Sequence, residues 1–119
     1  MYSTLMLDHF QNPRNAGEVA DADSVAQIEN PGCGDVLRLS LKISAGRIAE
    51  IRFKAKGCVP SMACASALTE LVAGRTLDEV HSLHRDTLIA AVGGLPQAST
   101  HAAQLALDAF SAALQQLKS

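Results

Sequence analysis

Four residues in three separate stretches are candidates to bind a metal or sulfur. Gly-Cys-Gly-Asp places Cys33 between two glycines and Asp35 two residues later. Gly-Cys-Val-Pro contains Cys58, and Thr-His-Ala contains His101. Thiolate, imidazole and carboxylate groups are ligands of tetrahedral zinc and of many iron sites. These residues would therefore form a metal or sulfur site if the fold brought them together.

The surroundings of the cysteines indicate which thiols are available for chemistry. The glycines beside Cys33 let a ligand or partner approach its sulfur closely. Cys58 precedes a helical pattern, and the N-terminal end of a helix favours the thiolate form. Cys64 shares the apolar stripe of that helix, which predicts a buried, inert thiol. His81 and His84 are expected on the solvated face of one later helix.

Composition and charge exclude several classes of protein. With 119 residues, 48% of them apolar, the chain fits one globular domain covering residues 1–119. The odd number of cysteines, three, argues against a disulfide framework. A net charge of −2 without a basic stripe predicts neither nucleic acid nor a membrane surface as a partner. The sequence shows no membrane-spanning run and no signal peptide, so a cytoplasmic location is expected.

Two stretches of alternating apolar and polar residues predict the strands that position the cysteines. Residues 35–43 and 48–55 both have a period of two, which is typical of half-buried strands. Residues 24–29 form a weaker strand pattern. The apolar face of the two clear strands is expected to comprise Leu37, Leu39, Leu41, Ile43, Ala49, Ile51, Phe53 and Ala55.

A hairpin between these two strands would bring the two thiols together. With Ser-Ala-Gly as a three-residue loop, the predicted register places Leu39 opposite Ile51. The same register places Cys33 opposite Gly57, and Cys58 is the next residue. Both thiols are therefore expected at one end of the sheet.

Helical patterns occupy the remainder of the chain. Strands followed by helices predict an α+β fold, with helices packed on a small three-stranded antiparallel sheet and a long C-terminal helix. The local start and stop signals are typical of helix ends. The helices are expected over residues 2–13, from Cys58 to Gly74, from Thr76, from a cap at Asp86, and from Ser99 or Thr100 onward.

Three motifs in order resemble the iron–sulfur cluster assembly scaffold family, of the IscU type or the N-terminal domain of NifU. YSTLMLDHFQNPRNAGEV resembles the family's N-terminal Asp-His-Phe/Tyr-x-Asn-Pro-Arg-Asn-x-Gly segment. NPGCGDVLRLSLKI resembles its first cysteine motif, and IRFKAKGCVPSMACASALTELVAGRTLDEV its second. The resemblance covers almost the whole chain and implies the same α+β fold.

The resemblance also implies a function without catalytic turnover. Members of this family receive sulfur from a cysteine desulfurase, assemble a transient [2Fe–2S] cluster from iron and sulfide, and pass it to acceptor apoproteins with a cluster-transfer chaperone. Zinc often occupies their apo site. Carried over by motif, Cys33, Asp35 and Cys58 match family ligands, and His101 matches the histidine beside the third cysteine.

The segment around His101, which corresponds to the family's third cysteine motif, departs from the family pattern. Ala102 stands where the family has its third cysteine, and residues 97–99 replace the Pro-Val-Lys of the chaperone-recognition stretch. One interpretation is a scaffold that binds iron and sulfide, or zinc, through a Cys/Asp/His site. The alternative is a degenerate member that builds no cluster and acts as a zinc-binding sulfur relay, or as a docking module for a desulfurase or chaperone.

Overall fold

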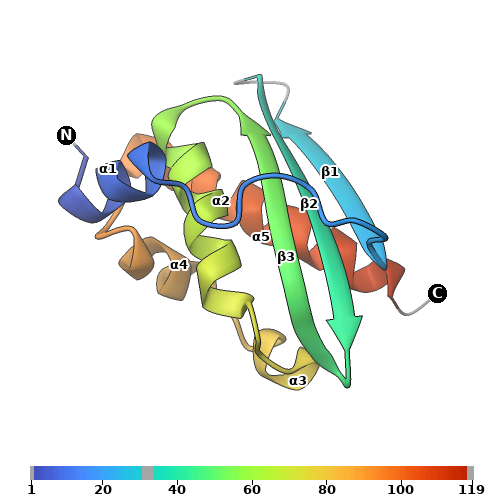
Figure 1. The fold of residues 1–119 in the computed structure, drawn as a ribbon. Coiled ribbons are helices and arrows are strands. Elements are labelled where there is room, and N and C mark those ends of the chain that lie inside the picture. Colours follow the sequence, from blue (N-terminus) through green and yellow to red (C-terminus); the bar gives the residue numbers. More distant parts are fainter. Residues whose placement is uncertain (1, 31–33, 118–119) are drawn as a thin grey trace.

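The computed structural model describes residues 2–30 and 34–117, and it has helices packed on one face of an antiparallel sheet (Figure 1). The sheet has the spatial order β1 (Ser24–Asn30), β2 (Asp35–Ser44), β3 (Arg47–Lys56). The helices are α1 (Thr4–Gln11), α2 (Val59–Val72), α3 (Leu77–Val80), α4 (Arg85–Ala91) and α5 (Thr100–Gln116), with a 3₁₀ turn, η1 (Gln97–Ser99), before α5. Within the described residues, no helix combines the length and apolar character needed to cross a membrane. The predicted α+β architecture is confirmed.

The β2–β3 hairpin forms as expected, but the predicted register is wrong by two residues. Leu39 pairs with Phe53 instead of Ile51. The loop contains two residues, Ala45 and Gly46, with φ angles of 53° and 74°, and the register changes between Lys42 and Ile43. Side chains alternate between faces with a period of two. The predicted apolar residues from Leu37 to Leu41 and from Ile51 to Ala55 therefore stay on one face. Ala49 does not, because at the register change Ile48 is buried in its place and Ala49 is exposed.

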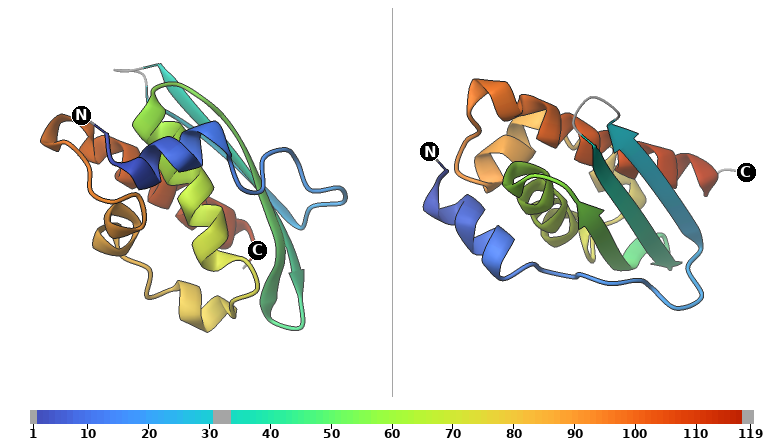
Figure 2. Two further views of the ribbon diagram at one scale, coloured as in Figure 1. Left: turned by 60° about the vertical axis from the view of Figure 1, so that its left-hand side comes forward. Right: turned by 90° about the horizontal axis from the view of Figure 1, so that it is seen from above.

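The core lies between the sheet and two helices. α2 packs on β3, whereas α5 packs on β1 and β2. Figure 2 shows α5 on one side of the sheet and the N-terminal segment on the other. Every residue of α2 between Ala63 and Thr69 is buried. Small side chains dominate this stretch, so the helix can approach its neighbours closely on all sides.

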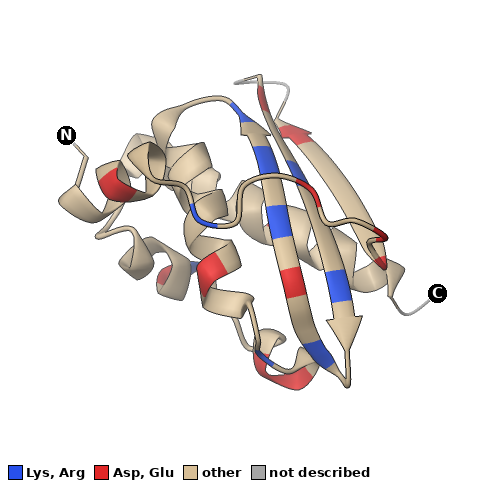
Figure 3. Ribbon diagram, viewed as in Figure 1, with Lys and Arg blue, Asp and Glu red and all other residues tan. Residues whose placement is uncertain are grey.

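The segment between α1 and β1 runs along the edge of β3 and then over the charged face of the sheet (Figure 3). Phe53 donates its backbone N–H to Asn15 O at 3.0 Å, and Gly17 donates its own to Phe53 O at 2.8 Å. Glu18 forms an ion pair with Arg38 at 3.0 Å. The segment therefore covers part of an otherwise open strand edge and balances part of the positive charge on this face.

Most helix ends follow the local signals in the sequence. The Ser3 hydroxyl accepts the N–H of Met6 at 3.0 Å and caps α1. Thr76 and Glu79 form the predicted capping box at the start of α3. Gly74 follows the end of α2 with φ 81°, as expected for a residue that terminates a helix.

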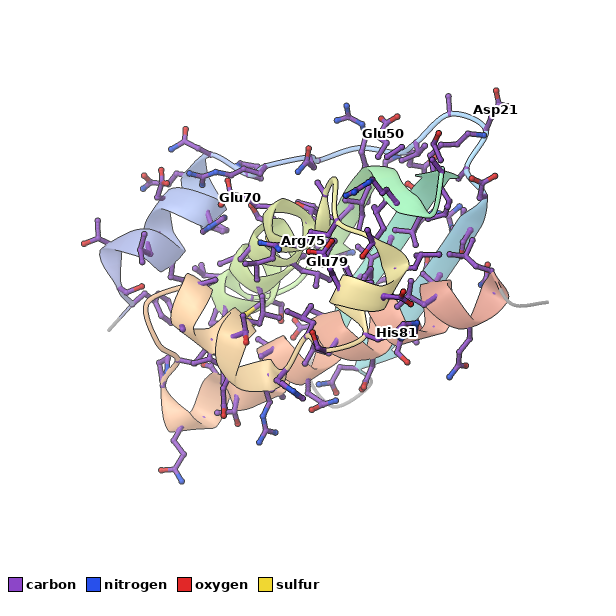
Figure 4. All side chains as sticks on the ribbon, turned by 90° about the horizontal axis from the view of Figure 1, so that it is seen from below. Asp21, Glu50, Glu70, Arg75, Glu79 and His81 are labelled. Atoms are coloured by element: carbon purple, nitrogen blue, oxygen red, sulfur yellow. The ribbon has the colours of Figure 1, made fainter. Side chains whose placement is uncertain are left out.

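Two expectations about the following segment are wrong. Asp86 does not cap α4, because this helix begins at Arg85 with His84 in the N-cap position. His81 is the C-cap of α3, so His81 and His84 flank two different helices instead of sharing one. Figure 4 shows His81 beside α3. Both histidines are exposed, which agrees with the expected solvated position.

Candidate metal centre

Three of the four predicted ligands meet at one end of the sheet. Asp35 is the first residue of β2, Cys58 is the N-cap residue of α2, and His101 is the second residue of α5. One ligand atom from each lies within 4.8 Å of the other two. Their service as ligands stays a prediction. So does that of Cys33, which lies outside the described residues.

The hairpin register and one glycine bring Asp35 to Cys58. Val36 pairs with Lys56, so continuing this register places Asp35, and not Cys33, opposite Gly57. The backbone N–H of Cys58 donates to Asp35 Oδ1 at 3.1 Å. A Cβ atom at residue 57 would lie only 2.1 Å from the same oxygen. The carboxylate therefore lies directly against the backbone of Gly57, where no larger residue fits.

Asp35 is almost completely buried, with 1% of its surface exposed, yet it is held in the ionised form. Burial is the largest influence and raises the pKa of Asp35. Hydrogen bonds from Ser61 and Cys58, together with the charge of His101, outweigh burial and lower the net pKa below its ordinary value of 3.8. At neutral pH the site therefore contains a carboxylate, which is the form that binds metal ions.

His101 supplies a buried nitrogen that lacks a hydrogen bond. Its Nε2 atom lies 3.5 Å from Asp35 Oδ2, within ion-pair distance. This contact does not satisfy hydrogen-bond geometry, and no other partner for the nitrogen exists in the described part of the chain. Buried polar atoms in folded proteins are normally satisfied. A metal ion bound between His101 and Asp35 would satisfy this one.

Ser61 is a site residue that the sequence analysis missed. Its hydroxyl donates to Asp35 Oδ2 at 2.8 Å and lies 3.2 Å from Cys58 Sγ. The side chain is only 5% exposed. A signal was present, because residues three apart on a helix lie on the same face, and Ser61 follows Cys58 by three.

The donor set fits zinc or ferrous iron. Cys58 has an exposed thiol, and sulfur, imidazole and carboxylate ligands are all common in zinc sites. Cys64 does not belong to this set, since it is fully buried in the core. Burial, followed by the negative charge of Cys58, raises the pKa of Cys64 to about 12. The expected inertness of this thiol agrees with its environment.

Comparison with known proteins places this chain in a family. The NifU-like N-terminal domain family matches residues 1–119. The chain belongs to this family. This NifU-like domain is 42% identical over 114 residues to the iron–sulfur cluster assembly scaffold protein IscU 1 of Archaeoglobus fulgidus, covering 96% of this chain and 74% of that protein. It is 38% identical over 122 residues to the scaffold protein IscU of Escherichia coli, covering 99% and 94%.

The fold of this NifU-like domain also matches a solved structure. The N-terminal part of a NifU-like protein from Brucella abortus superimposes with a TM-score of 0.79 and 22% sequence identity, covering 98% of this chain and 93% of that chain. This likeness confirms the fold. The position of Ala102 relative to the family's third cysteine stays a prediction from the motif order.

Proposed function

We propose that this NifU-like domain is a scaffold for iron–sulfur cluster assembly and not an enzyme. The relatives from Archaeoglobus fulgidus and Escherichia coli are named as such scaffolds. The observation that carries the proposal is the convergence of Asp35, Cys58 and His101 within 4.8 Å. The buried His101 Nε2, which has no hydrogen-bond partner among the described residues, supports it. Iron and sulfide would be the substrates, bound by these three residues and Cys33.

The mixed ligand set suits a cluster that must be released. Iron–sulfur clusters are usually held by cysteine thiolates, although histidine can replace cysteine on one iron. Here two thiolates, Cys33 and Cys58, would act with Asp35 and His101. Because oxygen and nitrogen are harder donors than sulfur, this set would hold a [2Fe–2S] cluster less tightly than four thiolates. Weaker retention favours transfer to an acceptor apoprotein.

The sulfur would come from a cysteine desulfurase. A thiolate of Cys58 or Cys33 would attack the terminal sulfur of the donor's persulfide, and the donor's own thiolate would leave. The exposed position of the Cys58 thiol supports this route. Transfer of the finished cluster would involve acceptor proteins and a cluster-transfer chaperone, in the cytoplasm.

Anaerobic reconstitution tests this function directly. The protein is incubated with ferrous iron, sulfide and a reductant, and then analysed by visible absorption, iron content and acid-labile sulfide. We expect a charge-transfer band with about two irons per cluster in the wild type. Cys58→Ala should lose it, whereas Cys64→Ala serves as the matched control because that thiol lies in the core. Equal iron content in Cys58→Ala and wild type would refute the proposal that Cys58 binds the cluster.

A second function is favoured by the chemistry of the donors. Cys58, His101 and Asp35 offer one sulfur, one nitrogen and one oxygen donor, and with Cys33 they would make up the four ligands of a tetrahedral zinc site. A domain that keeps zinc would act as a sulfur relay or a docking module for a desulfurase or chaperone. The same reconstitution separates the two functions. A colourless protein with one zinc that accelerates a desulfurase would support the relay.

A further inference from the structure

The two carboxylate oxygens of Asp35 have different partners. Oδ1 accepts the backbone N–H of Cys58 at 3.1 Å. Oδ2 lies 3.5 Å from His101 Nε2 and 3.7 Å from Cys58 Sγ. Oδ2 is therefore the oxygen that faces the other two ligand atoms, and the residue that fixes its direction influences the whole site.

Ser61 is the side chain that fixes Oδ2. Its hydroxyl donates to Asp35 Oδ2 at 2.8 Å, which is the shortest hydrogen bond that this carboxylate accepts. The same hydroxyl oxygen lies 3.2 Å from Cys58 Sγ. Ser61 belongs to the first turn of α2 and is 5% exposed, so its position is fixed by the helix. One buried hydroxyl thus contacts two of the predicted ligands.

We propose that Ser61 is a positioning residue of the metal centre, an inference that rests on the metal-binding function proposed above. Before metal binding, its hydroxyl donates to Asp35 Oδ2 and holds this oxygen toward Cys58 and His101. With a metal bound at Oδ2, the hydroxyl could instead donate to the thiolate of Cys58, which lies 3.2 Å away. The proton stays on the serine throughout, and only its acceptor changes.

This arrangement has two consequences for the bound metal. Outer-sphere hydrogen bonds orient metal ligands, and their loss typically lowers metal affinity by about 10- to 100-fold. A hydrogen bond to the ligand sulfur also withdraws charge from the thiolate, which is one factor that sets the reduction potential of iron–sulfur clusters. Ser61 would therefore affect both the affinity of the site and the electronic state of its sulfur.

The first test is zinc affinity, measured by competition with a chromophoric chelator. Ser61→Ala should bind zinc about tenfold more weakly or worse. Ser66→Ala is the matched control, because Ser66 is a buried serine of the same helix that contacts His9 and the Arg14 N–H instead of the site. Ser66→Ala should keep wild-type zinc affinity even if its metal-free form unfolds at a lower temperature.

A second pair of variants separates the hydroxyl from packing. Ser61→Thr and Ser61→Val have nearly the same shape and differ in the hydroxyl. Ser61→Thr should bind zinc more tightly than Ser61→Val. Both variants add a methyl group, so any loss of stability that this group causes affects them equally. Cobalt provides a spectroscopic measure, since its sulfur-to-metal charge-transfer band reports on the thiolate ligands, Cys58 among them. This band should shift in Ser61→Val relative to Ser61→Thr, which a purely structural role would not cause.

A double-mutant cycle tests whether Ser61 acts through Asp35. In an Asp35→Ala background, the further change Ser61→Ala should lower zinc affinity by less than it does in the wild type, and the loss that remains measures the hydrogen bond to the Cys58 thiolate. A wild-type protein that binds neither zinc nor cobalt would overturn the proposed function and this inference together. A wild-type protein that binds both, with Thr and Val variants equal in affinity and spectrum, would overturn only the role of Ser61.

Discussion

Asp35 is buried as an anion, and the residues that surround it explain how the chain tolerates this charge. The N–H of Cys58 and the hydroxyl of Ser61 each donate to one of its oxygens. Gly57 leaves the space that the carboxylate occupies. Removing any one of these partners would leave part of a buried charge unsatisfied, which is costly.

Replacing Gly57 should damage the site through a steric clash with Asp35, in addition to the backbone strain that a φ of 152° imposes on any other residue. In Gly57→Ala the new Cβ would lie 2.1 Å from Asp35 Oδ1, so the carboxylate must move. We expect a loss of about 1–3 kcal/mol in the free energy of unfolding, as for other overpacked sites. Zinc affinity should fall about tenfold or more, since the ligand is displaced. Denaturant unfolding and chelator competition measure the two effects.

Gly74→Ala is the control for this prediction. Gly74 also has a positive φ, 81°, but nothing lies within 4 Å of a Cβ built on it. This variant should lose about 1–2 kcal/mol from backbone strain and keep its zinc affinity. If Gly57→Ala retained normal zinc affinity as well, the close contact between Gly57 and Asp35 would not determine the position of the carboxylate.

His9 should make the stability of the fold depend on pH. Its Nδ1 lies 2.9 Å from Ser66 Oγ, and Nε2 lies 3.9 Å from Glu70, on the side of α2 that faces α1 (Figure 4). Burial lowers the pKa of His9 most, and the charge of Arg14 adds to this. The opposing charges of Glu70 and Asp8 do not compensate, so the net pKa is below 6.5.

The sign of the effect follows from proton binding. Below about pH 6.5 the unfolded chain binds a proton at His9 that the folded chain resists. The free energy of unfolding should therefore fall as the pH decreases from neutral through this range. Urea unfolding of the metal-free protein at about pH 7.5 and about pH 5.5 measures this decrease in the free energy of unfolding. A His9→Gln variant should show a smaller decrease, and an equal decrease would contradict the role of His9.

At the scale of elements, α2 is the helix around which the fold is arranged. It contacts α1, α4, α5 and β3. Ala67 on this helix is 1% exposed, so no face is free to accept a larger side chain there. The Ala- and Ser-rich sequence of α2 therefore reflects packing on every side, in contrast to the single buried stripe of a surface helix.

Enlarging a small residue of α2 should destabilise the protein. Ala67→Leu adds three carbons at a closed position, with an expected loss of about 1–3 kcal/mol. Ala90 in α4 is exposed, so Ala90→Leu should change stability by no more than about 0.5 kcal/mol. Chemical denaturation of both variants tests this. If Ala67→Leu left the free energy of unfolding unchanged, α2 would have to be able to shift away from its neighbours.

The sequence predicted the elements better than the connections between them. Alternation located β2 and β3, since each has one buried and one polar face. Their register was missed because a two-residue loop and a register change between Lys42 and Ile43 together shift the pairing. This change also breaks the alternation of β3, where Ile48 is buried and Ala49 is exposed. Residue type singled out Asp35, Cys58 and His101, which the structure brings together. Gly57 matters through a contact that a sequence does not display, and the only sequence signal for Ser61 is its spacing of three residues from Cys58.

At the scale of the whole molecule, the site connects parts of the chain that are far apart in sequence. Asp35, Cys58 and His101 come from β2 and from the beginnings of α2 and α5. An unfolded chain cannot keep these three residues together. A metal that binds them will therefore bind the folded state in preference and stabilise it.

Zinc should raise the stability of the wild-type domain in a site-dependent manner. At a free zinc concentration of about 100 times Kd, the expected gain is about 2.7 kcal/mol. A chelator should reverse this gain. Thermal unfolding with and without zinc provides the measurement, and Cys58→Ala should show little shift. An equal shift in Cys58→Ala would indicate zinc binding elsewhere on the chain.

The unequal partners of the two Asp35 oxygens also determine which cations the site can select. Oδ1 accepts the backbone N–H of Cys58, whereas Oδ2 faces Cys58 Sγ and His101 Nε2, so an ion bound among these atoms would take the carboxylate mainly through Oδ2, which favours monodentate coordination. Calcium requires six to eight oxygen ligands and commonly takes carboxylates in bidentate fashion. Zinc and ferrous iron accept fewer ligands and softer ones. The hydrogen bond at Oδ1 would therefore disfavour hard cations such as calcium relative to zinc and ferrous iron.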